Sequence, residues 1–480
     1  MAAVATPVRM ATPTGRWLLV ATILGSSIAM LDATVVNVAL PRLGADLDAG
    51  VGGLQWTLNG YTLALASLIL LGGALGDRWG RRRIFVVGVV WFAVASALCG
   101  LAPNVELLVA ARVLQGVGGA LLTPGSLALI SASIDERDRG SAIGAWAGIG
   151  GVATAIGPIF GGWLVDAVSW RAVFLINVPV AVAIVWIALR HVPESRDESA
   201  ARSIDVPGVV LGAAGLAALT YGLIASTLPV TVLGLVLLVL FGWQQRRAAD
   251  PLMPLSMFAD RVFAAANLVT LVVYAAIGGT FFLFVLFLQV VVGYTPLQAG
   301  AASLPITLLM LLLSSYAGAL GERIGPRIPM TVGPLVGACG LLLMLRIDAD
   351  STYVADVLPA VVVFGLGLST MVAPLTTAVL SAAPSSQAGL ASGINNAIAR
   401  TGQLLAVAAL PSLVGIVGDG YADPQVVDDG FTQAMLICAG LLVGGAVTAA
   451  LLVRRGPSVH EIPVERQARC GVDCPASYPE

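Results

Sequence analysis

The chain has 480 residues, of which 58% are hydrophobic and only 11% are charged, and its net charge is −2. A soluble domain carries about 25% charged residues, so this composition excludes an ordinary soluble protein and requires lipid as the solvent. The near-neutral balance also gives no indication of a nucleic-acid partner.

Long apolar runs predict fourteen membrane-spanning helices, because a helix needs about 20 residues to cross about 30 Å of hydrocarbon. The first six runs are 17–41, 54–75, 84–102, 105–134, 141–165 and 172–189. The next run, 206–243, is too long for one crossing and is predicted to be a hairpin that turns near Pro229. The last six runs are 262–292, 299–320, 328–345, 354–382, 388–417 and 431–453.

The positions of the basic residues, all of them arginine, predict the orientation in the membrane. With the N-terminus inside, only Arg42, Arg171 and Arg346 fall outside, and Arg112 and Arg400 fall within helices. All other arginines then lie on the cytoplasmic side, as the positive-inside rule requires. This asymmetry favours an even number of helices with both termini cytoplasmic.

An internal repeat predicts two related halves. The segment 73–82, GALGDRWGRR, recurs as GALGERIGPR at 318–327, between the second and third helix of each half. The predicted fold class is therefore an all-α polytopic membrane protein with two six-helix bundles related by a pseudo-two-fold repeat. The predicted segments are a cytoplasmic tail 1–16, a bundle 17–190, an inserted hairpin 206–243, a bundle 262–453 and a cytoplasmic tail 454–480.

Asp32 and Arg112 are the candidates for proton coupling, because ionisable groups inside a membrane are costly and usually functional. Asp32 lies nine residues before Pro41, and Arg112 lies eight residues after Asn104, so the two side chains are expected at comparable depth. Three alternatives stay open: a pair that switches proton affinity, a static ion pair, or no contact.

The repeated loop is a candidate gate between the halves. A cluster of Asp77 with nearby arginines could join the halves in one state and release them in another, although a simple topology anchor is the alternative. The residues concerned are Gly73, Asp77, Arg78, Gly80, Arg81, Arg82, Glu322 and Arg323.

Two further groups of residues are candidates. Helical spacing places Asn396, Arg400 and Gln403 on one face, where Arg400 either meets a polar or anionic part of a substrate or bonds to carbonyls. With Asn37 and Gln115, these are the candidate cavity residues. The glycine-rich fifth helix is predicted to pack closely against a neighbour and to kink at its proline. Its residues are Gly148, Gly157, Pro158, Gly161 and Gly162.

These stretches together resemble the 14-helix drug:proton antiporter family of the major facilitator superfamily. The similarity lies in the 73–82 loop, the first-helix stretch 31–41 (LDATVVNVALP), the fourth-helix set Arg112, Gln115, Gly116, Gly118 and Gly119, and the fifth-helix glycines. The resemblance implies export of small lipophilic organic compounds, such as drugs or antibiotics, through alternating access. The fifth-helix motif is the one associated with exporters. An extra membrane acid, which some relatives carry for dicationic drugs, is absent from the second half.

The resemblance leaves other cargoes and roles open. A dedicated exporter of a metabolite, siderophore or lipid-like compound, a symporter, and a non-transport membrane sensor or scaffold are the alternatives. The expected setting is a bacterial cytoplasmic membrane, with a monomer embedded in the bilayer and a small-molecule substrate.

No enzymatic activity and no cofactor is expected, with the proton gradient as the energy source. The chain has no lysine, which excludes a phosphate-binding glycine-lysine loop, and only His191 and His460 as histidines, which are too few for an enzyme-like metal cluster. Cys470 and Cys474 in the tail make a poor zinc site by themselves.

Overall fold

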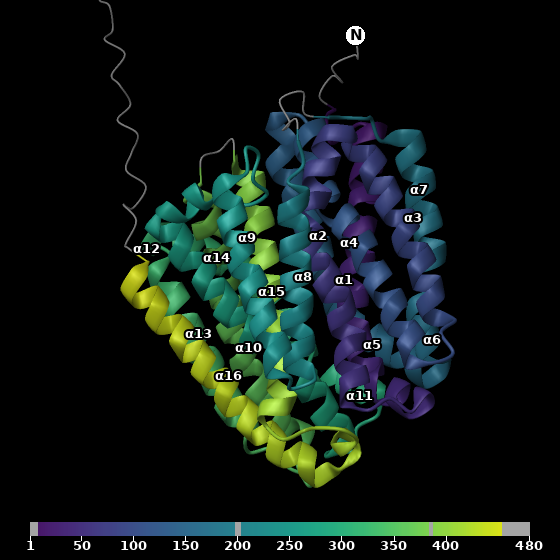
Figure 1. Cartoon of the computed structure of the whole chain (residues 1–480), viewed down its shortest axis with the longest axis vertical. Coiled ribbons are helices and arrows are strands. Elements are labelled where there is room, and N and C mark those ends of the chain that lie inside the picture. The colour runs from purple at the N-terminus through teal and green to yellow at the C-terminus, as the bar shows by residue number, and fades with distance from the viewer. Residues whose placement is uncertain (1–7, 197–202, 384–386, 454–480) are drawn as a thin grey trace, which may run out of the picture.

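The computed structural model describes residues 8–196, 203–383 and 387–453, and in these ranges the chain is helical without a β-strand (Figure 1). The predicted tail 454–480, with Cys470 and Cys474, lies outside the described residues. The first half contains α1 (Pro13–Leu47), α2 (Val51–Trp79), α3 (Arg81–Gly100), α4 (Val105–Ser133), α5 (Glu136–Ala167), α6 (Trp170–Leu175) and α7 (Asn177–His191).

Two helices follow in the middle of the chain, α8 (Val206–Ile224) and α9 (Leu228–Arg247). The second half contains α10 (Arg261–Val290), α11 (Pro296–Ala302), α12 (Leu304–Ile324), α13 (Arg327–Met344), α14 (Leu358–Ser381), α15 (Ala388–Leu413) and α16 (Pro424–Leu452). Short 3-10 and π turns, η1 (Leu255–Ala259), η2 (Tyr353–Val357) and η4 (Gly420–Ala422), lie beside them.

Thirteen helices of the described residues are long and apolar enough to cross a membrane, with α6–α7 and α11–α12 each counted once. The helix α15 is not among them, although it lies against α2 and α10. Its sequence places Asn395, Asn396, Arg400 and Gln403 within the predicted span, and these side chains lower its hydropathy. The number of fourteen spanning helices therefore stays a prediction.

Several helix ends differ from the predicted ones, and prolines lie near each of them. The first helix does not end at Pro41 but continues to Leu47, so the predicted depth of Asp32 below its outer end was too small. The sixth run is divided between α6 and α7 at Ile176, because Pro179 has no N–H to bond the carbonyl four residues earlier. A similar break at Ser303, two residues before Pro305, separates α11 from α12.

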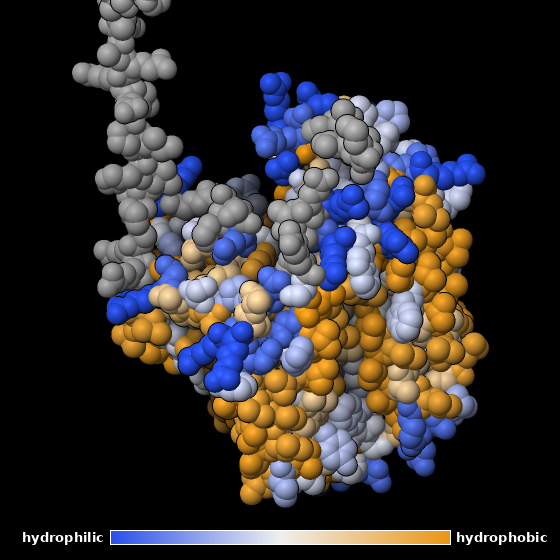
Figure 2. Space-filling model, turned by 45° about the horizontal axis from the view of Figure 1, so that its top comes forward, coloured by the Kyte–Doolittle hydropathy of each residue, from blue (hydrophilic) through white to orange (hydrophobic). Residues whose placement is uncertain are grey.

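The helices form two groups with α8 against the seam between them. In Figure 1 the purple and blue helices α1–α7 lie on one side and the green and yellow helices of the second half on the other, except for the short α11, which lies beneath α5. The helix α8 packs on α9 and also touches α2 of the first half and α15 of the second. Figure 2 shows a broad apolar surface on the face in view and polar side chains gathered at one end.

We call this polar end the arginine-rich end, since α2, α7 and α9 end there and α3, α5, α10 and α13 begin there with arginines in their terminal turns. The opposite end, with α6 and α11, is the arginine-poor end. The positive-inside rule predicts that the arginine-rich end is cytoplasmic.

Glycines bring the helices of each half into backbone contact. A Cβ at Gly72 of α2 would lie 2.0 Å from the Ala120 carbonyl oxygen of α4, and one at Gly340 of α13 would lie 2.4 Å from the Phe364 backbone nitrogen of α14. Only a residue without a side chain permits such an approach. Each half is therefore held by dispersion contacts, since lipid provides no hydrophobic driving force between helices.

Two adjacent glycines of α2 provide a matched test of this packing. A Cβ at Gly73 would meet Pro124 only at 3.8 Å, an ordinary contact distance. Overpacking costs about 1–3 kcal/mol, so Gly72→Ala should lower the thermal midpoint of the purified protein. Gly73→Ala should leave it unchanged. Thermal unfolding in detergent measures both, and equal midpoints would contradict the close α2–α4 contact.

Candidate functional site

A buried hydrogen-bond network joins Asp32 of α1 to Arg112 of α4. Arg112 Nη1 donates to Asp32 Oδ2 at 2.6 Å, and the exposed fractions of the two side chains are 1% and 0%. The amide of Gln115 lies between them: its nitrogen donates to Asp32 Oδ1 at 2.9 Å, and its oxygen accepts from Arg112 Nη1 at 2.6 Å. The two candidate coupling residues are thus in direct contact, despite 80 residues between them.

Three members of this network were not anticipated from the sequence. Asn177 Nδ2 donates to Asp32 Oδ1 at 3.3 Å and to Ser96 Oγ at 2.9 Å, and the Thr57 carbonyl accepts from Arg112 Nε at 2.9 Å. Asn177 is the first residue of α7, so the break beside Pro179 places its amide next to Asp32. The proline that directly follows the intramembrane Asn177–Val178 pair was the available signal.

The guanidinium of Arg112 also lies against aromatic rings. Its central carbon is 4.5 Å from the centroid of Tyr61 and 5.7 Å from that of Phe174. Such cation–π contacts replace part of the hydration that the guanidinium has lost. Asp32 accepts three hydrogen bonds, so both oxygens of its buried carboxyl group have partners in the network.

A cavity of about 330 Å³ lies between the two halves. Its wall comes from α1, α2, α4 and α5 of the first half and from α10, α12, α14 and α15 of the second, whereas α8 and α9 contribute nothing. Arg112 lines this cavity while Asp32 lies behind the wall. The Arg112 side chain therefore separates Asp32 from the space that a substrate would occupy.

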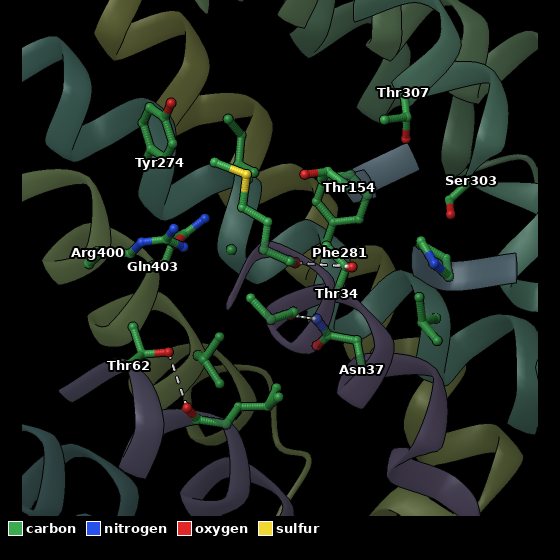
Figure 3. Close-up of a pocket in the computed structure, with 18 of the residues that line it drawn as sticks. Thr34, Asn37, Thr62, Thr154, Tyr274, Phe281, Ser303, Thr307, Arg400 and Gln403 are labelled. Atoms are coloured by element: carbon green, nitrogen blue, oxygen red, sulfur yellow. Dashed lines mark hydrogen bonds between the residues drawn. The ribbon is translucent and has the colours of Figure 1, made fainter. Parts of the chain in front are cut away.

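The predicted cavity residues divide into two groups. Asn37, Arg400 and Gln403 line the cavity, and Figure 3 shows all three in its wall. Gln115 does not, because it is fully buried in the Asp32 network. Asn396 does not either, since it is exposed one turn nearer the arginine-rich end. Its neighbour Asn395 instead donates to Asn267 and Thr270 of α10.

The fifth-helix glycines lie where α5 meets α1 and α11. A Cβ at Gly157 or Gly161 would collide with Thr34 or Val35 of α1, and one at Gly162 would lie 2.6 Å from the Leu297 Cα of α11. Pro158 lines the cavity. Gly148 is different, because nothing lies within 4 Å of the position of its Cβ. The C-terminal part of the motif, from Gly157 to Gly162, thus packs against both halves.

The repeated loop contacts its own half in this structure. Asp77 pairs with Arg81 at 2.7 Å, and the backbone nitrogens of Arg82 and Arg83 donate to the Glu194 carboxylate at 3.0 and 3.2 Å. Arg78 and Arg323 are exposed. The Glu322 side chain lies outside the described part of the chain. Bonds from this loop to the second half, which a gate would form, are not present among the described side chains.

The loop repeat is also a repeat in backbone geometry. Gly80 has a φ of 109° and its counterpart Gly325 has a φ of 86°, in the region that side-chain-bearing residues rarely adopt. Each glycine turns the chain between the second and third long helix of its half, at the arginine-rich end. The two halves therefore share the turn as well as the sequence.

The hydrogen bonds that join the halves lie towards the arginine-poor end. Gln55 Nε2 of α2 donates to the Val407 and Ala408 carbonyls of α15 at 2.8 and 3.0 Å. Gln289 of α10 donates to the Val38 carbonyl at 3.1 Å, and the Leu297 nitrogen donates to Asp166 at 3.0 Å. At the arginine-rich end, Figure 2 shows a notch between the two halves.

Tyr421 of η4 adds to this closure. Its hydroxyl lies beside Gly44 of α1, where a Cβ would be 2.9 Å away. Burial and the neighbouring carboxylates of Asp419 and Asp48 raise the pKa of Tyr421, so the phenol stays protonated. Among the described residues the halves are thus joined by hydrogen bonds at the arginine-poor end and separated by a notch at the other, as in one state of a carrier whose central cavity is reached from alternate sides.

Two bundles with a charged pair beside a central cavity define a polytopic transporter of the secondary type, and comparison with known proteins gives its family. Residues 22–407 match the family model of the Major Facilitator Superfamily, and the chain belongs to this superfamily. It is a membrane transporter of small molecules and not an enzyme.

Proteins of similar sequence are resistance and efflux proteins. The tetracenomycin C resistance and export protein of Streptomyces glaucescens is 38% identical over 84% of this chain and 77% of that protein. The puromycin resistance protein pur8 of Streptomyces alboniger is 35% identical over 91% of each chain. The multidrug efflux pump LfrA of Mycolicibacterium smegmatis is 31% identical over 93% of this chain and 89% of that protein.

Solved structures support the fold. A bacterial homologue of the lysosomal transporter Spinster, inward-facing and occupied, has a TM-score of 0.67 at 18% identity and covers 93% of this chain and 98% of its own. A POT family transporter in complex with 5-aminolevulinic acid has a TM-score of 0.70 at 14% identity, with 93% of this chain and 99% of that chain covered.

A double-mutant cycle tests the buried pair. Removing one partner leaves a buried charge uncompensated and costs about 3–5 kcal/mol, so Asp32→Asn or Arg112→Gln should each lower the thermal midpoint more than the double variant does. The exposed pair of Asp46 and Arg171, at 3.3 Å, is the control. Its cycle should show a coupling of about 0–1 kcal/mol. Additive losses at Asp32 and Arg112 would contradict the contact.

The closure at the arginine-poor end gives a second test. Gln55→Ala removes two hydrogen bonds between the halves, and each is worth about 0.5–1.5 kcal/mol. We expect the population open at that end to rise about tenfold. In a background without the five native cysteines, Val407→Cys, in the cavity wall, should react faster with a membrane-impermeant maleimide added from that side. Unchanged labelling would show that Gln55 does not hold the closure.

Proposed function

We propose that this protein exports small lipophilic organic compounds from a bacterial cell in exchange for protons. The observation that carries the proposal is the Asp32–Arg112 pair, in which Arg112 is both the partner of a buried carboxylate and part of the cavity wall. A substrate that fills the cavity keeps Arg112 against Asp32 and so disfavours a proton on that carboxyl, whereas a proton on Asp32 frees Arg112 to enter the cavity.

The coupling follows from competition for one carboxylate. With Arg112 in place, both oxygens of Asp32 are satisfied by hydrogen bonds. When a proton neutralises Asp32, Arg112 loses its counter-ion and turns into the cavity, where it occupies the space of the substrate. Substrate and proton then exclude each other in one transport cycle, which is the requirement for antiport. The proton gradient supplies the energy, without a cofactor.

The conformation fits the loading step of an exporter. With the arginine-rich end in the cytoplasm, the cavity of this structure faces inward, where a compound to be exported is collected. Closure of that end would need new contacts, and the exposed Arg78 and Arg323 of the repeated loops are available for them. The gating role of the loops is therefore proposed for the state in which the arginine-rich end is closed.

The cargo class rests on the relatives. Their names include resistance or export of tetracenomycin C, puromycin and methylenomycin A. The cavity fits this range, because its volume is at the lower end of drug-sized sites and its wall is mostly apolar. A dedicated metabolite exporter is the alternative within the same mechanism.

Efflux from cells tests the proposal. Cells that express the protein should become resistant to at least one of these three antibiotics, and a protonophore or Asp32→Asn should abolish the efflux. Asp46→Asn, which removes an exposed carboxylate from the same helix, is the matched control and should keep it. Uphill efflux by Asp32→Asn would disprove the coupling role. Proton-dependent uptake of the compound would indicate a symporter, and resistance to none of them would favour a dedicated exporter.

A further inference from the structure

The cavity carries one guanidinium whose charge is not balanced by a carboxylate. Of the residues that line the cavity, only Arg112 and Arg400 are charged, and Arg112 is neutralised by Asp32. Among the ion pairs of the described residues, none includes Arg400. Its recorded hydrogen bond is to Gln403 Oε1 at 3.2 Å. Together the lining charges and Asp32 leave the site with one positive charge.

Close backbone packing holds Arg400 in this position. A Cβ at Gly402 of α15 would lie 2.4 Å from the Leu271 carbonyl oxygen of α10, and one at Gly278 of α10 would lie 2.8 Å from the Gln403 Cα. These two glycines bring α15 against α10 and fix its rotation. Figure 3 shows Arg400 and Gln403 side by side in the cavity wall, near Tyr274.

Several polar groups of the wall have a donor engaged within their own helix. The hydroxyls of Thr34, Thr62 and Thr154 each donate to a carbonyl of their own helix, and the Asn37 amide nitrogen does the same. Their oxygens remain free to accept. An anion in the cavity would therefore find its strong donor at Arg400. A cation would meet the charge of Arg400 without a free carboxylate.

When the cavity closes, the unpaired charge of Arg400 determines which substrates are accepted. In the open state water hydrates Arg400, but closure around a substrate removes much of this water, and an unpaired charge in a dry, apolar site is costly. An acidic group on the substrate removes that cost, because guanidinium and carboxylate form short, charge-assisted hydrogen bonds. A neutral or cationic substrate does not.

We propose that the cavity selects amphipathic aromatic anions, with a carboxylate or phenolate at Arg400 and the ring system against the apolar wall. Tyr61, Tyr274 and Phe281 line the same cavity and provide faces for the rings. The inference rests on the proposed export function and specifies its substrate class. Arg400 is thus a specificity-determining residue and has no part in proton transfer.

Two dyes of the same ring system test the charge preference. Fluorescein is an anionic xanthene and rhodamine 123 is a cationic one, so shape is nearly constant while the charge changes sign. Fluorescence anisotropy with the purified protein in detergent should show at least tenfold tighter binding of fluorescein. Equal affinities, or tighter binding of rhodamine 123, would overturn the proposal.

Variants assign the preference to one residue. Arg400→Gln should weaken fluorescein binding at least tenfold and leave rhodamine 123 binding unchanged or stronger, while Arg400→Lys should restore most of the fluorescein affinity. Unchanged fluorescein binding in Arg400→Gln would overturn the assignment. The Lys variant guards against misfolding of the Gln variant, since it keeps the charge in the same place.

The binding assay also separates this inference from the proton coupling. Asp32→Asn removes the carboxylate that neutralises Arg112, so fluorescein binding to this variant should be kept or strengthened, whereas Arg400→Gln should weaken it. If Asp32→Asn still drove uphill efflux while binding depended on Arg400, the coupling proposal would fail and the substrate class would stand. If fluorescein binding did not depend on Arg400 while efflux required Asp32, the substrate class would fail and the coupling proposal would stand.

Discussion

The cost of a charge in hydrocarbon governs the arrangement of the first half. Asp32 and Arg112 are completely buried, and neither would be tolerated there alone. Their network draws side chains from α3, α4 and α7, and the break at Ile176 places one of them, Asn177. Glycines keep α2 against α4, and the Thr57 carbonyl of α2 accepts from Arg112. A packing requirement and an electrostatic one therefore both constrain α2 and α4.

The second half follows a different rule. Its fifth long helix, α15, carries Arg400 in the cavity wall without a carboxylate partner among the described residues. The two halves thus share a fold and a turn glycine but differ in how they treat an arginine at the cavity. In the first half the protein supplies the counter-ion, and in the second half we propose that the substrate does.

The sequence predicted the helical bundle and the repeat, and it placed Asp32 and Arg112 at comparable depth, because hydropathy and intramembrane charge are strong local signals. It did not predict contacts that depend on helix rotation and on breaks. Asn396 has the correct helical spacing for the cavity, yet it is exposed near the open end, and Gln115 faces the ion pair instead. Asn177 was missed because its position depends on where the chain breaks next to Pro179. The loop partners of Asp77 depend on the conformational state, which no sequence pattern encodes.

The bond donated by Gln55 has a consequence for how such carriers can diversify. Its acceptors are main-chain carbonyls of Val407 and Ala408, and Val407 also forms part of the cavity wall. A carbonyl is present whatever side chain the residue carries. The wall can therefore be remodelled at that position for a new cargo while the latch between the halves stays intact. Recognition and closure share a residue but use different atoms of it, which leaves each free to change without the other.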